Sequence, residues 1–182
     1  MTASRATPPG ATLHLARWTV TSGSNARSRG AVVITADEHE WRASAGGNGA
    51  IEALYQAVDK ALNEVLNGHP RLLAYDIHAL GEGTDTIGAV SVRIAPPETT
   101  GERGTGEYGG EARGVNIIAA SIEAYIMALN EMLGEAHWSG ATDAAASRRR
   151  APVSAGKARA QRADIDEGEG QHDTVAWFER QG

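Results

Sequence analysis

The side chains that most often carry catalysis or bind metals are scattered along this 182-residue sequence. No two histidines stand three or four positions apart, and none joins a carboxylate at a recognised ligand spacing. The chain also has no cysteine, no GxSxG motif and no phosphate-binding loop with its lysine. We therefore predict no metal, no cofactor and no catalysis by this chain alone. We expect surface or strand positions for the histidines: His14, His39, His69, His78, His137 and His172.

The segment Gly104–Gly109 fits the GxGxxG pattern of dinucleotide-binding loops. In that fold a strand runs directly into the loop and a helix runs directly out of it. Here Pro96 and Pro97 interrupt the chain before the loop, and further residues separate the loop from the next predicted helix. We therefore interpret the segment as a glycine-rich link.

Two other glycine turns each stand just before a predicted helix. Asn48 and Gly49 precede the first helix, and Gly114, Val115 and Asn116 precede the second. A helix that starts from such a turn offers free backbone N–H groups to an anion. If the two turns are related by pseudo-twofold symmetry, they could hold a small carboxylate beside apolar side chains. The alternative is that glycine only permits a sharp start to each helix.

The bulk composition limits the classes of partner. The chain is 41% hydrophobic and 5% aromatic, which suits one domain with a small-aliphatic core plus additional sequence. Its formal net charge of −6 argues against a nucleic-acid partner. No apolar window is long enough to span a bilayer, and the first residues lack an apolar signal core. We therefore expect a cytoplasmic protein with no membrane partner.

Hydrophobic periodicity predicts regular elements between residues 12 and 134. A strand with a phase change near Arg17 is followed by two strands expected to form a hairpin and then by a helix, and the same order then starts again. In the second round the third strand is short and weak, around Tyr108, and Asn116 is placed to cap the last helix. The expected strands are 12–21, 31–35, 40–45, 71–80 and 87–94, and the expected helices lie in 51–66 and in the stretch 113–133.

Three matches in the same order indicate an internal repeat. Residues 15–22 match 72–79, residues 31–35 match 89–93, and ALNE occurs at both 61–64 and 128–131. One βββα half has too small a core to fold alone. The sequence therefore predicts an α+β fold of two pseudo-symmetric βββα units, about 12–68 and 69–134, with the helices packed on one face of the sheets.

The two ends of the chain have a different composition. Residues 1–11 contain two prolines among small polar residues and are expected to be flexible. Residues 135–182 are rich in Ala, Ser, Arg and Gly, so we expect a disordered tail. Within this tail, residues 173–180 regain Val175, Trp177 and Phe178, which indicates either a docking segment or only an apolar chain end.

The segments GGNGAIEALYQAV (46–58), LLAYDIHAL (72–80) and RGVNIIAASIEAYIMALN (113–130) resemble the C-terminal regulatory domain of 2-isopropylmalate synthase and of the related citramalate and homocitrate synthases. The resemblance covers about residues 12–134. It implies a domain that pairs with a second copy and binds an end-product amino acid as feedback inhibitor. By resemblance, the candidate effector contacts are Asn48, Gly49, Ala50, Ala79, Gly114, Val115, Ile117 and Ile118.

The chain departs from the family at these positions. Ala50 and Glu52 stand where the family commonly has Pro and Asp, and Asn116 is followed at once by Ile117. The family's catalytic (β/α)₈ barrel needs at least about 200 residues. We therefore expect a stand-alone regulatory domain, a homodimer that binds leucine or a similar amino acid and modulates a separately encoded acyltransferase. The alternatives are a dimeric interaction protein that docks through its tail, and a divergent enzyme or carrier.

Overall fold

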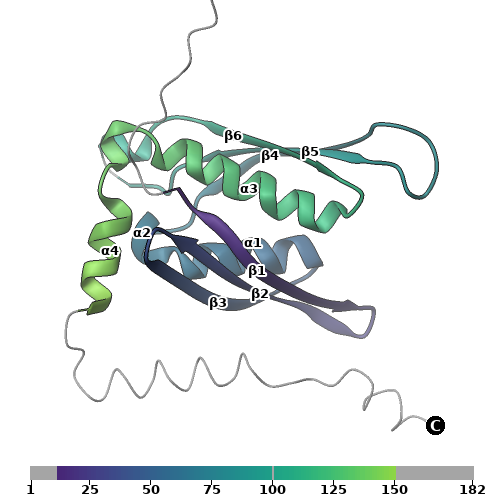
Figure 1. Cartoon of the computed structure of the whole chain (residues 1–182), viewed down its shortest axis with the longest axis horizontal. Coiled ribbons are helices and arrows are strands. Elements are labelled where there is room, and N and C mark those ends of the chain that lie inside the picture. The colour runs from purple at the N-terminus through teal and green to yellow at the C-terminus, as the bar shows by residue number, and fades with distance from the viewer. Residues whose placement is uncertain (1–11, 100, 151–182) are drawn as a thin grey trace, which may run out of the picture. The chain divides into compact units, whose positions relative to one another are not determined.

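The computed structural model describes residues 12–99 and 101–150. These residues form two three-stranded antiparallel sheets, in the orders β1-β2-β3 and β4-β5-β6, and a long helix follows each sheet (Figure 1). The predicted α+β fold of two βββα units is therefore confirmed. The first unit contains β1 (His14–Gly23), β2 (Ala26–Ala36), β3 (His39–Gly47), α1 (Ala50–Ala61) and α2 (Asn63–Leu66). The second contains β4 (Arg71–Ala79), β5 (Gly88–Ala95), η1 (Glu102–Gly104), β6 (Tyr108–Gly114) and α3 (Ile117–Leu133).

Strand pairing shows how closely the two units match. The register of β1 on β2 shifts between Leu15 and Arg17, and the register of β4 on β5 shifts between Leu72 and Ala74. Because 15–22 matches 72–79, the same bulge occurs at the same place in both units. The bulge also accounts for the phase change expected near Arg17, since one extra residue reverses the faces of those that follow.

The pairing corrects one detail of the repeat. Trp18 lies opposite Val32, and its counterpart Tyr75 lies opposite Val92. Residues 31–35 therefore correspond to 91–95, two positions later than the sequence match with 89–93. A shift of two residues leaves every side chain on the same face of a strand, so alternating apolar residues do not distinguish the two alignments.

Each helix covers part of one face of its own sheet. Helix α1 lies on β2 and β3, and α3 lies on β5 and β6. On the central strands the apolar side chains alternate toward the helices and are buried, namely Val32, Ile34 and Ala36 on β2 and Val90, Val92 and Ile94 on β5. The helix predicted over 51–66 is interrupted at Leu62, where α1 ends and α2 begins.

Helices α1 and α3 lie side by side and run in the same direction (Figure 1). The Tyr55 ring on α1 stacks on the Tyr125 ring on α3, with centroids 4.3 Å apart. One turn further along α1, Asp59 also contacts Tyr125. Because the helices run in the same direction, their N-terminal ends lie at the same end of the fold.

The segment that follows α3 differs from the disorder expected from residue 135. It forms the 3₁₀ turn η2 (Ala136–Trp138) and the helix α4 (Ala141–Arg150), which contacts α2. Trp138 is 2% exposed and Ala145 is 0% exposed, so this segment adds to the core. Alanine has the highest helix propensity and allows close helix contact, so a composition poor in large apolar residues still folds here. The expectations for residues 1–11 and 151–182, the 173–180 segment included, lie outside the described residues.

Within residues 12–99 and 101–150, no single helix is long and apolar enough to cross a membrane. Helix α3 together with 136–149 satisfies the length and composition criteria only as a pair bent by 93°.

Candidate functional site

The start of α1 is shaped by close contact between the helix and its sheet. A Cβ at Gly47 would lie 2.6 Å from the backbone nitrogen of Ala53, so only glycine fits at the end of β3. The Glu52 carboxylate accepts hydrogen bonds from the Asn48 backbone N–H at 2.8 Å and from the Gln56 side-chain amide at 3.1 Å. Gly49 is the N-cap and provides no side-chain acceptor for the first turn. The first turn of α1 therefore keeps N–H groups that an anion could use.

The start of α3 is capped differently. The Asn116 side-chain oxygen accepts hydrogen bonds from the backbone N–H groups of Ile118 and Ala119, at 3.0 and 3.2 Å. This confirms the predicted cap, and it occupies two of the N–H groups that an anion would need. The two helix starts are therefore equivalent in position and unequal in chemistry.

The structure separates the eight predicted effector contacts into two groups. Asn48, Gly49 and Ala50 form the start of α1. The other five gather at one end of the second sheet, where Ala79 pairs with Gly88 and Gly88 pairs with Gly114. The Ile117 side chain covers Gly88 so closely that a Cβ there would lie 2.0 Å from its Cδ1. Val115 is 61% exposed. Ile118, the last residue of the second group, is half-buried.

A network of tyrosine hydroxyls joins the two units, and it was not predicted from the sequence. The Tyr55 hydroxyl donates to the Ser121 carbonyl at 2.9 Å, and the hydroxyls of Tyr75 and Ser121 are 2.7 Å apart. The Tyr125 hydroxyl donates to the Asp59 carboxylate at 2.5 Å. Tyrosines at buried helix positions require partners for their hydroxyls. That requirement is the sequence feature from which the network could have been expected.

Asp59 is the carboxylic acid of this network, and its pKa is shifted. Burial raises its pKa to about 6, while the Tyr125 hydrogen bond and the His69 imidazole, 3.9 Å away, both act to lower it. Burial and then the Asp59 carboxylate raise the pKa of Tyr125, so Tyr125 remains a donor near neutral pH. Burial likewise raises the pKa of Tyr55. These groups can couple the two helices and respond to protonation below neutral pH.

The outer strand of the second sheet exposes apolar side chains on the face that carries α3. Leu72 and Ile77 lie opposite the buried residues Ile94 and Val90, so all four share that face. Yet Leu72 is 50% exposed and Ile77 is 44% exposed, because α3 covers β5 and β6 and stops short of β4. In the part of the chain that the structure describes, no group of three His, Cys, Asp or Glu side chains could hold a metal ion.

Comparisons with known proteins identify relatives of this chain by sequence. The chain is 33% identical over 114 residues to 2-isopropylmalate synthase of Nostoc sp. (strain PCC 7120), covering 62% of this chain and 19% of that protein. It is 31% identical over 134 residues to 2-isopropylmalate synthase of Methylobacterium nodulans, covering 74% of this chain and 24% of that protein. It is 32% identical over 123 residues to chloroplastic 2-isopropylmalate synthase 2 of Arabidopsis thaliana, covering 63% and 19%.

The chain therefore spans about a fifth of the length of the curated relatives it matches. The sequence profile of the LeuA allosteric (dimerisation) domain matches residues 1–133. The two βββα units, with their helices side by side, occupy the described part of that match. The chain belongs to the LeuA allosteric (dimerisation) domain family.

Proposed function

We propose that this chain is a regulatory module that binds a small amino acid such as leucine at the two glycine turns. The observation that carries the proposal is the placement of the two helix starts at the same end of the fold, with the α1 start free of a side-chain cap. The ligand carboxylate would bind the first-turn N–H groups of α1, where the helix dipole favours an anion. Apolar side chains of Val115, Ile117 and Ile118 would contact the ligand side chain.

Besides a site for its carboxylate, an amino acid needs a partner for its ammonium group, and Glu52 provides a carboxylate for that purpose. The Glu52 carboxylate accepts one hydrogen bond from the Asn48 backbone N–H and one from the Gln56 side chain, and it lies in the exposed first turn of α1. An ammonium group can bind such a carboxylate, whereas a simple carboxylic acid gains nothing from it. Glu52 therefore makes the proposed site selective for an amino acid over the same molecule without its amino group.

We further propose that the module forms a homodimer and modulates an acyltransferase barrel of the 2-isopropylmalate synthase type. The relatives that share this domain are named as 2-isopropylmalate synthases, and the family description includes both allostery and dimerisation. A tail-docking protein that binds no ligand is the alternative outcome of the experiment below.

Isothermal titration calorimetry tests the effector site. We expect L-leucine to bind with a measurable heat, and 4-methylpentanoate, which lacks the amino group, to bind at least about tenfold more weakly. Glu52→Gln should reduce this discrimination, because the amide keeps an acceptor for Asn48 but loses the charge. Glu64→Gln, an exposed change on α2, is the matched control. Absence of heat and of thermal stabilisation with leucine, isoleucine and valine at millimolar concentration would overturn the effector proposal.

A further inference from the structure

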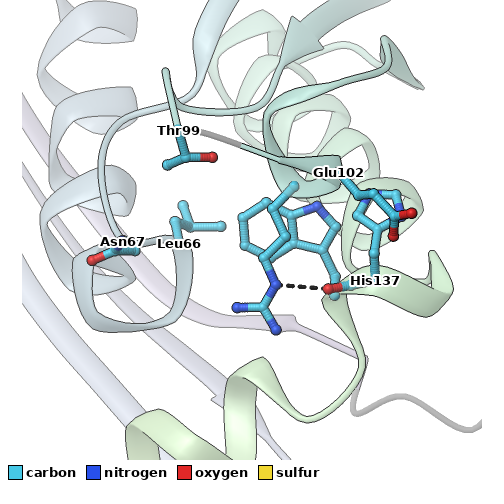
Figure 2. A pocket seen from close by; sticks show the side chains of 7 residues that line it. Leu66, Asn67, Thr99, Glu102 and His137 are labelled. Carbon is cyan, nitrogen blue, oxygen red and sulfur yellow. Dashed lines mark hydrogen bonds between the residues drawn. The ribbon is translucent and has the colours of Figure 1, made fainter.

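A cavity lies at the opposite end of the helices, and two of its lining residues, His137 and Trp138, follow the segment that the family profile matches. It is about 490 Å³ in volume. Figure 2 shows Leu66 and Asn67, at the end of α2, on one side of it and Glu102 and His137 on the other. The wall is completed by Thr99, Arg103 and Trp138. Because α3 is 17 residues long, this cavity is about 25 Å from the glycine turns.

Unpartnered polar atoms are concentrated in the wall of this cavity. Four buried side-chain atoms lack a hydrogen-bond partner among the described residues, and three of them belong to Thr99, His137 and Trp138. The side chain of Trp138 is almost completely enclosed, with 2% of the residue exposed. A buried polar atom that has no hydrogen-bond partner destabilises the folded chain. Three such atoms around one cavity indicate polar partners other than the described residues.

Arg103 supplies a fixed positive charge at the same place. Its Nε donates to the His137 carbonyl at 2.6 Å, and its guanidinium carbon lies 5.2 Å from the centroid of the Trp138 ring. Among the described residues, no carboxylate forms an ion pair with it. The remaining guanidinium N–H groups can therefore bind a carboxylate in the bidentate manner typical of arginine.

We propose that this cavity binds a small organic monocarboxylate. The ligand carboxylate pairs with Arg103 and accepts a hydrogen bond from the Trp138 indole N–H, and the hydroxyl of Thr99 and Nε2 of His137 complete its polar contacts. Leu66 and the Trp138 ring provide the apolar wall for the carbon chain. Glu102 lines the same cavity, so a second negative charge on the ligand is disfavoured. The site is distinct from the proposed effector site and does not depend on it.

The indole N–H resonance of Trp138 in ¹⁵N-labelled protein reports on this cavity directly, and its loss in Trp138→Phe assigns it. We expect 3-methylbutanoate to shift this resonance saturably, and 3-methylbutan-1-ol, which lacks the carboxylate, to leave it unchanged. Arg103→Gln should weaken the binding by about tenfold or more. Arg93→Gln, an exposed arginine on β5, should bind as the unmodified protein does.

Valine has the carbon skeleton of 3-methylbutanoate with an added amino group. Comparing the two compounds therefore shows whether the cavity prefers an amino acid or a simple carboxylic acid. Tighter binding of valine in this cavity assigns the site to amino acids through Glu102, and tighter binding of 3-methylbutanoate assigns it to simple acids. The Trp138 response should persist in Glu52→Gln, which separates this site from the effector site. No saturable shift of Trp138 with either compound, or an unchanged affinity in a folded Arg103→Gln protein, would overturn the proposal.

Discussion

The Tyr125 hydroxyl on α3 donates a hydrogen bond of 2.5 Å to the Asp59 carboxylate on α1, and this contact ties the two βββα units together through their helices. Asp59 is 13% exposed, so its charge is poorly hydrated in the folded chain. The Tyr125 bond and His69 only partly offset the cost of burial, which is why the carboxyl retains its proton at higher pH than usual.

Stability should therefore fall as the pH rises through the titration range of Asp59. Its pKa is raised from 3.8 to about 6 on folding, so the folded chain binds more protons between these values. The stabilisation from this group is complete below about pH 4 and lost above about pH 6, with a magnitude of up to about 3 kcal/mol. Asp59→Asn keeps the acceptor for Tyr125 and removes the titration.

Urea unfolding from pH 4 to pH 7 measures this effect. The unfolding free energy of Asp59→Asn relative to the unmodified chain should rise by about 2–3 kcal/mol across that range. Asp76→Asn, at an exposed aspartate on β4, should show no such pH dependence. Parallel curves for the unmodified chain and Asp59→Asn would contradict the assignment.

Gly110 marks the point where α3 lies closest to its sheet. A Cβ there would lie 2.0 Å from the Ala124 carbonyl oxygen and 2.6 Å from the Ala128 nitrogen, and both are backbone atoms that a side-chain rotation cannot move. Gly110→Ala should therefore lower the unfolding free energy by about 2 kcal/mol or more, since the helix must shift away from β6. Thermal or chemical unfolding measures the loss.

The adjacent residue gives the matched control for that change. A Cβ at Gly109 would lie 3.6 Å from the nearest atom, an ordinary contact, so Gly109→Ala should change stability little. Equal destabilisation by the two substitutions would indicate a general cost of losing glycine in β6 and would argue against a specific helix contact.

The fold was predictable from sequence because its signals are local and repeated. Alternating apolar residues in the strands, the glycine turns and the ALNE repeat each reflect the packing of one unit, and the chain shows most of them twice. The repeat also made β6 detectable around Tyr108, within a glycine-rich segment that has little strand character of its own.

Contacts between distant segments were not predictable in this way. Helix α4 was missed because its alanines are stabilised by docking on α2 and by Arg148, whose guanidinium donates to the Glu64 carbonyl at 2.7 Å. The Asp59–Tyr125 bond and the cavity at Arg103 also depend on residues far apart in the chain. For the candidate effector site, sequence located the two turns and the Asn116 cap of α3, but did not reveal that α1 starts without a side-chain cap.

Asn130 should matter more than its counterpart in the first unit. Its side-chain amide donates to the Leu13 carbonyl at 2.9 Å and accepts from the Leu13 N–H at 2.8 Å, which joins α3 to the residue before β1. Asn130→Ala should cost about 1–3 kcal/mol, because Leu13 is 1% exposed and its backbone groups would lose their partner. Denaturant unfolding should show a smaller change for Asn63→Ala, the exposed asparagine at the same position of the other ALNE segment.

The exposed face of β4 is the surface where we expect a second copy of the chain to bind. Leu72 and Ile77 extend the apolar face that α3 covers on the neighbouring strands, and each is close to half exposed. Burying a lysine charge in such an interface is unfavourable, so Ile77→Lys should weaken dimerisation by at least about tenfold. His78→Lys adds the same charge to the opposite face of the same strand and should leave the dimer intact. Sedimentation velocity over a range of concentrations compares the two variants, and a dimer that survives Ile77→Lys while dissociating with His78→Lys would place the interface on the other face of the sheet.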